Sequence, residues 1–280
     1  MKNLPTSNEL EKFYSDFMRD DLTRPKNYQI NYTKKEREHI KLLNELRIHA
    51  ILKIRKKWNT KKISLLEIGV GEGFTIAHAA SKGWSVHGID FSSSGIKRFN
   101  PTIISKIEFG NAYDILKNTK RKYDLCMINN VLEHVIDPRE VLKYLRRVLE
   151  KNGLIALTVP NDFSDIQKTA LKLHHIKNKF WIDPPEHLHY FNTKNIQKFL
   201  NNQKFKIHDM YSSFPIDFFL YHPGSNYIEN EKNGKGVHQA RIELEVLLSK
   251  SGIENYHKLC QSFANCNVGR NFTVIISPKN

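Results

Sequence analysis

The chain has 280 residues, of which 40% are hydrophobic and 26% charged, and its formal net charge is +15. This length suits one large domain with a substantial core, and the excess of Lys and Arg favours nucleic acid, an acidic membrane surface or anionic small molecules as partners. Three scattered cysteines argue against a disulfide framework or a zinc cluster. No apolar run reaches the ~18 residues of a membrane helix and no signal peptide begins the chain, so we expect a soluble cytoplasmic protein.

The first part of the chain is predicted to be helical. Residues 8–19 form one candidate helix, and residues 33–58 form a longer one with apolar side chains at helical spacing. The opposite face of the longer helix is rich in Lys and Arg. We therefore expect residues 1–62 to form an N-terminal helical cap.

From residue 63 onward, short apolar runs alternate with segments of helical length. Asp137 is suited to cap the last of these helices, Pro138 suits its first turn, and Glu140 completes the spacing of a capping box. Such alternation predicts a parallel sheet with helices on both faces. The predicted strands are 63–68, 85–90, 106–109, 123–128 and 154–159, and the predicted helices are 74–81, 93–99 and 138–149.

Beyond residue 161 the alternation becomes irregular. We predict helices at 163–182, 193–203, 239–250 and 254–264, strands at 205–210 and 272–276, and mostly loop at 212–238. The expected organisation is a core at 63–162, a substrate-side segment with a late strand at 163–211, an inserted cap at 212–270 and a final core strand at 271–280. Long insertions inside compact domains usually serve function.

The strongest motif is a glycine-rich turn after the first predicted strand. Its sequence is Glu67-Ile68-Gly69-Val70-Gly71-Glu72-Gly73. Glycines at a strand-to-helix turn let a ligand approach bare backbone, and the G-x-G-x-G spacing differs from the dinucleotide-binding G-x-G-x-x-G. The next strand ends in Asp90, where a carboxylate can accept both ribose hydroxyls of an adenosine.

Together with later segments, these motifs resemble the class I S-adenosylmethionine-dependent methyltransferases over residues 63–161. The other matching segments are 86–90, 110–112, 124–135 with its Val-Leu-Glu-His-Val ending, and 153–161. The resemblance implies an α/β fold with a Rossmann-like seven-stranded sheet, methyltransferase activity, and S-adenosylmethionine as the cofactor.

The resemblance also implies residues that meet the methionine portion of the cofactor. Gly69, Gly71 and Gly73 would let the backbone reach the methionine portion and the ribose. Glu67 would bind the ammonium group of the cofactor, directly or through water, and Asn129 would lie beside the transferable methyl.

The resemblance implies four residues that contact the adenosine portion of the cofactor. Asp90 would hold the ribose diol, and Phe91 would offer its face to the adenine. Asn111 and Ala112 would read the adenine edge, with Asn111 in place of the Asp that the family often carries.

Three histidines are candidate catalytic bases. Methyl transfer from a sulfonium is an in-line displacement, so an enzyme chiefly aligns the nucleophile, and a hydroxyl nucleophile also benefits from a base. His134 is the first candidate, and a backbone-bonding role is the alternative. His187 and His189 in the segment 183–191 are further candidates as base or substrate anchor, with loop shaping as their alternative.

A metal centre is not expected from the sequence. Glu133-His134 matches part of the Glu-x-x-Glu-His pattern of metal-binding ubiquinone-biosynthesis O-methyltransferases, but Asn130 stands at the first Glu position. The histidines at 187 and 189 lack a cysteine or a further ligand at the spacing of zinc sites.

The candidate substrate-binding residues lie beyond the fifth strand. Arg241 is suited to bind phosphate or carboxylate through its planar guanidinium, and ordinary turns and helix surface are the alternative reading of the region. The other candidates are Glu186, Tyr190, Asn226, Tyr227 and His238.

These observations favour O-methylation of a sugar or another anionic small molecule, a chemistry that also occurs in surface-polysaccharide pathways. An RNA methyltransferase is the alternative favoured by the net charge, although no RNA-binding module or base-flipping signature is visible. A non-catalytic cofactor-binding subunit is a third possible function. The acceptor and the oligomeric state stay open.

Overall fold

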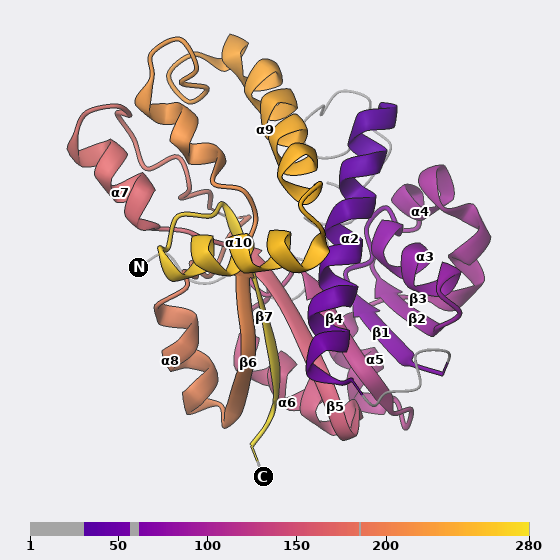
Figure 1. Ribbon diagram of the computed structural model, residues 1–280. Coiled ribbons are helices and arrows are strands. Elements are labelled where there is room, and N and C mark those ends of the chain that lie inside the picture. Colours follow the sequence, from indigo (N-terminus) through magenta and orange to yellow (C-terminus); the bar gives the residue numbers. More distant parts are fainter. Residues whose placement is uncertain (1–30, 57–61, 185, 280) are drawn as a thin grey trace.

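The computed structural model describes residues 31–56, 62–184 and 186–279 (Figure 1). The predicted helix at 8–19 and the C-terminal end of the predicted helix at 33–58 lie outside these ranges. No helix in the described ranges is both long and apolar enough to cross a membrane.

One seven-stranded sheet forms the centre of the molecule, with the strand order β3-β2-β1-β4-β5-β7-β6. β1 to β5 run parallel, whereas β7 is antiparallel to both β5 and β6. The seven-stranded α/β sheet expected from the sequence is confirmed, and its parallel part coincides with the region of regular alternation. The strands are β1 (Ser64–Ile68), β2 (Ser85–Asp90), β3 (Ile107–Phe109), β4 (Tyr123–Asn129), β5 (Leu149–Pro160), β6 (Phe205–Ser212) and β7 (Asn271–Pro278).

Up to β5, the helices predicted at 74–81, 93–99 and 138–149 are confirmed with small changes of bounds, whereas α5 was not predicted. Thr33 caps α2 in a complete capping box with Glu36. Asp137 caps α6 by accepting from the Arg139 backbone N–H, but Glu140 accepts from the Tyr144 hydroxyl and closes no capping box. The α-helices are α2 (Lys34–Ile54), α3 (Phe74–Ser81), α4 (Ser94–Phe99), α5 (Ala112–Asn118), α6 (Pro138–Val148), α7 (Asp165–Lys172), α8 (Asn195–Asn202), α9 (Gly234–Ser249) and α10 (Ile253–Asn265).

Two predictions in the second half were wrong. The helix predicted at 163–182 ends at Lys172, because His174 adopts a left-handed conformation with φ of 60° that a continuing helix cannot accommodate. The loop predicted at 212–238 contains two 3-10 turns, Ile216–Tyr221 and Glu231–Asn233, and α9 begins at Gly234. Glycines near the start of α9 weaken the helical signal of its sequence.

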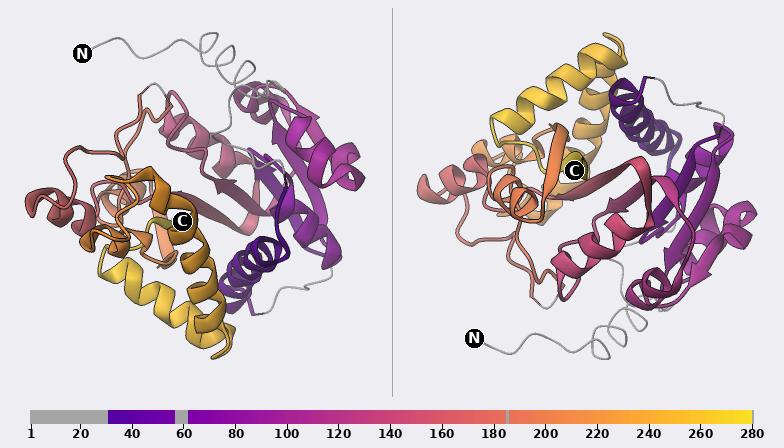
Figure 2. Two further views of the ribbon diagram at one scale, coloured as in Figure 1. Left: turned by 90° about the horizontal axis from the view of Figure 1, so that it is seen from above. Right: turned by 90° about the horizontal axis from the view of Figure 1, so that it is seen from below.

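The sheet is covered on both faces, as the two views of Figure 2 show. Alternate strand residues pack against α5, α6 and α8 on one face and against α2, α3 and α10 on the other. α10 belongs to the core through the fully buried Tyr256 and Cys260, although it lies within the predicted cap. α9 instead packs beside α2 at the edge of this layer (Figure 1).

Candidate active site

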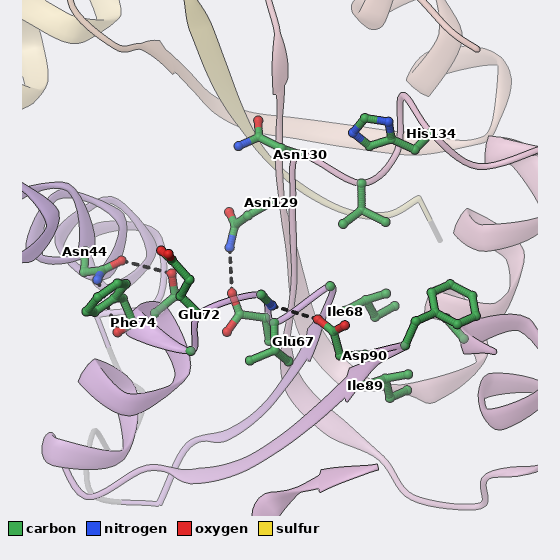
Figure 3. Close-up of a pocket in the computed structure, with 18 of the residues that line it drawn as sticks. Asn44, Glu67, Ile68, Glu72, Phe74, Ile89, Asp90, Asn129, Asn130 and His134 are labelled. Carbon is green, nitrogen blue, oxygen red and sulfur yellow. Dashed lines mark hydrogen bonds between the residues drawn. The ribbon is translucent and has the colours of Figure 1, made fainter. Parts of the chain in front are cut away.

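A cavity of about 710 Å³ opens at the carboxyl ends of β1 to β4. Residues that directly follow these strands line one side of it, and side chains of α2 and α9 line the other. In open α/β sheets, ligands bind outside the carboxyl ends of the strands, and this volume lies in the usual range for small-molecule sites. Figure 3 shows Glu67 and Asp90 near each other at the strand ends, with His134 apart from them.

The glycine turn is shaped by close backbone packing. Gly69 has φ of +71°, and a Cβ added there would lie 2.2 Å from Cγ2 of Val131. The backbone N–H of Gly71 donates to Asp90 Oδ2 at 2.7 Å, and that of Ser92 donates to Asp90 Oδ1 at 2.9 Å. Asp90 thus joins the first turn to the second strand while lining the cavity.

Glu67 is a buried carboxyl group at the floor of the cavity. Its Oε1 accepts a hydrogen bond from Asn129 Nδ2 at 2.9 Å, and Asn129 Oδ1 accepts one from Thr158 Oγ1 at 3.0 Å. Its Oε2 has no hydrogen-bond partner among the described residues. Burial raises the pKa of Glu67 to about 7. A cationic ligand group at this point would therefore meet an unsatisfied acceptor.

The residues predicted for the adenine end also line the cavity. Phe91 is 42% exposed, so its ring is available to a ligand. Asn111 caps α5, since its Oδ1 accepts from the Tyr113 N–H at 2.9 Å, and Ala112 is the first residue of that helix. An amide oxygen has a second lone pair, so the cap leaves Asn111 able to accept a further bond.

Helix α2 and Tyr32, which precedes it, supply polar lining residues that the sequence prediction missed. Tyr32, Glu36, His39, Asn44 and Arg47 all line the cavity. Arg47 Nη1 donates to Asn44 Oδ1 at 2.9 Å, while its buried Nε has no partner among the described residues. These polar side chains recur at helical spacing and interrupt the predicted apolar stripe of the helix. Polar residues within an apolar stripe are the sequence signal that could have revealed them.

On α9, Arg241 and His238 line the cavity, as predicted for substrate-binding residues. Arg241 Nη2 lies 3.3 Å from His238 Nδ1, and its Nε lies 3.9 Å from the buried carboxylate of Glu245. Glu245 Oε2 is 2.5 Å from His39 Nε2, and its Oε1 accepts from the Tyr256 hydroxyl at 2.9 Å. Burial acts to raise the pKa of Glu245, but His39, Arg241 and the Phe214 backbone N–H together outweigh it, so the pKa is lowered.

Of the three predicted catalytic histidines, His134 lines the cavity. Its Nδ1 donates to the backbone oxygen of Glu186 at 2.7 Å, so in the neutral ring Nε2 carries the lone pair. Nε2 is 3.7 Å from Glu133 Oε1. Burial lowers the pKa of His134 to about 4. Glu186 itself, a predicted substrate residue, also lines the cavity.

Five other predicted residues are not among those that line the cavity. His189 Nε2 lies 2.9 Å from the Val135 backbone oxygen, which is the loop-shaping alternative considered from the sequence. The Asn226 amide donates to the Leu220 backbone oxygen, and the Tyr227 hydroxyl bonds to Asp217. The remaining two, His187 and Tyr190, have rings in an edge-to-face contact with centroids 6.3 Å apart.

The lining of the cavity matches the parts of the cofactor that the sequence resemblance implies. At one end it offers the unsatisfied Oε2 of Glu67 to an ammonium group, and at the other the exposed ring of Phe91 to a planar base. Asp90 lies between them, at the end of β2, where a ribose diol would be recognised. These residues fit S-adenosylmethionine.

Comparison with known proteins supports the same assignment. Residues 33–209 match the family described as a methyltransferase domain. A ubiquinone biosynthesis O-methyltransferase of Nitrosomonas europaea is 29% identical over 127 residues, covering 42% of this chain and 52% of that protein. A tRNA 5-carboxymethoxyuridine methyltransferase of Escherichia coli K12 is 32% identical over 108 residues, covering 36% of this chain and 41% of that protein. The chain thus spans about half the length of the curated relatives that it matches.

Solved structures share the fold at low sequence identity. A plantazolicin methyltransferase superimposes with a TM-score of 0.54 at 14% identity, covering 88% of this chain and 89% of that one. A methyltransferase from Archaeoglobus fulgidus superimposes with a TM-score of 0.50 at 19% identity, covering 83% and 93%. The chain therefore belongs to the methyltransferase domain family and has the fold of the class I S-adenosylmethionine-dependent methyltransferases.

Proposed function

We propose that the protein methylates an oxygen of a small-molecule acceptor that carries a carboxylate or phosphate group, such as a sugar acid or a sugar phosphate. The observation that carries this proposal is the position of Arg241. Its guanidinium lines the cavity opposite the glycine turn and is held by a buried carboxylate on its own helix.

The strand-end side of the cavity supports the cofactor half of the reaction. S-adenosylmethionine supplies an electrophilic methyl group on a sulfonium. On this chain, Glu67 would bind the ammonium group and Asp90 the ribose, while the glycine turn keeps its backbone accessible. Asn129 would hold the Glu67 carboxyl in place and mark the methyl end of the cavity.

The α2 and α9 side supports the acceptor half. Arg241 and Arg47 place two guanidinium groups on this side, and each keeps a buried Nε that makes no hydrogen bond to the described residues. Apolar residues Ile40, Leu43 and Ile242 lie among them. Such a surface suits an acceptor with an anionic group and a compact apolar face.

Orientation, rather than a histidine base, is the proposed source of catalysis. The lone pair of His134 Nε2 faces buried Glu133 at 3.7 Å, and its ring is fixed by the Glu186 carbonyl. Here the ionised carboxylate or phosphate oxygen itself would accept the methyl group, so no proton has to be removed and catalysis requires only alignment and removal of water. His134 would then position the acceptor side of the cavity through Glu186.

The test uses S-adenosylmethionine with a labelled methyl group and an extract of the source organism, separated into small-molecule, glycan, protein and RNA fractions. Label in the small-molecule or glycan fraction is expected. The extract is followed by a defined panel in which phosphorylated and carboxylated sugars are paired with their neutral analogues. Turnover of the anionic member of a pair, but not of the neutral one, would support the Arg241 assignment. Equal turnover of both would contradict it.

An RNA acceptor is the second candidate. The net charge of +15 and the similarity to a tRNA methyltransferase favour it. Label that disappears with RNase, together with RNA binding that weakens steeply with salt, would replace the first proposal by this one. Cofactor binding without label in any fraction would favour a non-catalytic subunit.

A further inference from the structure

A second group of polar side chains adjoins the cavity through His134, which the proposed function uses only to position Glu186. Glu133 and His134 come from the loop after β4, Asp162 follows β5, and His187 comes from the segment before α8. One ligand atom of each of Glu133, His134 and His187 lies within 4.8 Å of the others. Segments distant in sequence therefore bring three donors to one point.

The distances within this group are too long for hydrogen bonds. Glu133 Oε1 is 3.7 Å from His134 Nε2, and His187 Nδ1 is 3.9 Å from Asp162 Oδ2. Both carboxylate oxygens of Glu133 are buried and have no hydrogen-bond partner among the described residues, and the same holds for both oxygens of Asp162. Unsatisfied buried carboxyl groups are costly, so a ligand at this point would relieve the cost.

The orientation of His134 is that of a metal ligand. Its Nδ1 donates to the Glu186 backbone oxygen at 2.7 Å, and its Nε2 lies 3.7 Å from Glu133 Oε1, on the side where the ion would sit. Histidines that bind metals commonly donate their other ring N–H to a backbone carbonyl or a carboxylate. The ring of His187 packs against that of His134 with centroids 4.9 Å apart, on the same side.

We propose that Glu133, His134 and His187 form a site for a divalent transition-metal ion of the zinc type. Two imidazoles and a carboxylate suit zinc better than magnesium or calcium, which prefer oxygen ligands. Zinc bonds of about 2.1 Å place neighbouring donors about 3.4 Å apart in a tetrahedral site. The observed 3.7 Å between Glu133 and His134 needs only a small contraction to reach that spacing.

Asp162 and Arg270 form the surroundings of this site. One carboxylate oxygen of Asp162 faces His187. The other lies 4.0 Å from Arg270 Nη1. Asp162 would orient His187, and the ion would tie the loop after β4 to the segment that carries Glu186. Because Glu186 lines the cavity, the ion would stiffen the acceptor side of the site.

The experiment measures metal binding, so its outcome is independent of whether methyl transfer is found. Tag-free full-length protein is stripped with chelator and titrated with Zn²⁺ or Mg²⁺, with Cys266→Ser in every sample because this thiol is exposed. We expect one equivalent of bound Zn²⁺ by elemental analysis and little Mg²⁺. At a hundredfold excess over Kd, Zn²⁺ should raise the melting temperature by about 5 °C.

Four variants assign the site. Glu133→Gln keeps the shape of the side chain but removes its charge. Asp162→Asn changes a residue that does not touch the ion and should weaken Zn²⁺ binding ~10–100-fold. Glu133→Gln and His187→Ala should each weaken it by more than this. His174→Ala removes an exposed histidine on the turn after α7 and should change nothing. Cofactor binding by each variant checks that it is folded.

Two results would overturn the assignment. One is wild-type protein that binds no Zn²⁺ with a Kd below about 10 µM and shows no change in melting temperature, which would mean that water alone fills the group. The other is Zn²⁺ binding that persists unchanged in the protein carrying both Glu133→Gln and His187→Ala, which would place the ion elsewhere.

Discussion

The strand-end wall of the cavity and the wall formed by α2 and α9 are built from different kinds of contact. On the strand-end wall, backbone N–H groups of Gly71 and Ser92 bind Asp90, and Gly69 packs directly on Val131. On the helical wall, side chains hold other side chains, as in the buried pair of His39 and Glu245.

We infer from this difference that the strand-end wall binds the cofactor and that the wall formed by α2 and α9, the helical wall, determines which acceptor binds. Backbone contacts hold their geometry whatever side chains surround them, so they suit a cofactor that never changes. Cavity-facing helix side chains outside that buried pair, such as Arg241, can be exchanged without disturbing the sheet, so they suit recognition of a particular acceptor. The following predictions test whether the strand-end wall controls cofactor affinity and the helical wall controls acceptor affinity.

The largest effect is expected from Gly69→Ala. The added Cβ would lie 2.2 Å from Val131, so the turn must shift, and displacements of about 1 Å at a site cost on the order of a hundredfold. Cofactor affinity, measured by calorimetry, should fall by that amount. Gly83→Ala is the matched control, because Gly83 also has positive φ but no atom within 4 Å of an added Cβ. Equal affinities of the two variants would contradict the packing argument.

Arg241→Ala should affect the helical wall alone. Loss of a charge-assisted contact of about 1.5–3 kcal/mol would raise the KM of an anionic acceptor by roughly tenfold to a hundredfold, with cofactor affinity unchanged. Steady-state kinetics on the labelled acceptor measures the first and calorimetry the second. Arg139→Ala, an exposed arginine on α6, serves as the control. A fall in cofactor affinity instead would mean that the two walls are not independent.

Glu67→Gln should change the pH dependence of cofactor binding. With a pKa of about 7, the free carboxyl group is neutral below pH 7 and ionised above it, so only at higher pH can it attract the cofactor's ammonium group. The ratio of the variant Kd to the wild-type Kd should rise from near one at pH 6 to about tenfold at pH 8. Glu108→Gln, at an exposed carboxyl on β3, should give a flat ratio. A flat ratio for Glu67→Gln would argue against the ammonium contact.

The smallest effect is expected from Lys35→Ala. Lys35 and Glu243 join the same two helices as the buried pair of His39 and Glu245, but both side chains are at least half exposed. Exposed ion pairs contribute little, so the melting temperature should stay within about 2 °C and the acceptor KM should not change. A tenfold rise in KM would show that surface charges also shape the helical wall.

Much of the fold could be predicted because its signals are local. Short apolar runs alternating with segments of helical length marked the parallel strands, and the bounds predicted for helix 74–81 are those of α3. Of the predicted cofactor residues, all line the cavity, because each directly follows a strand or belongs to a strand end.

The helical wall could not be predicted in the same way. Polar residues such as Arg47 and His39 interrupt the apolar stripe of α2, but that they line this cavity depends on how α2 packs beside the sheet, which the stripe alone does not encode. Likewise, His187 and His189 share one segment, yet one joins Glu133 and His134 while the other bonds to backbone oxygens. Their difference depends on where a neighbouring loop lies.

The position of β7 has a consequence for how the molecule reaches its folded state. β7 follows α9 and α10 in the chain, yet it lies between β5 and β6 and pairs with both. During synthesis, β5 and β6 leave the ribosome first and present unpaired edges until β7 arrives. Closure of the sheet is therefore a late, long-range event in the formation of the fold.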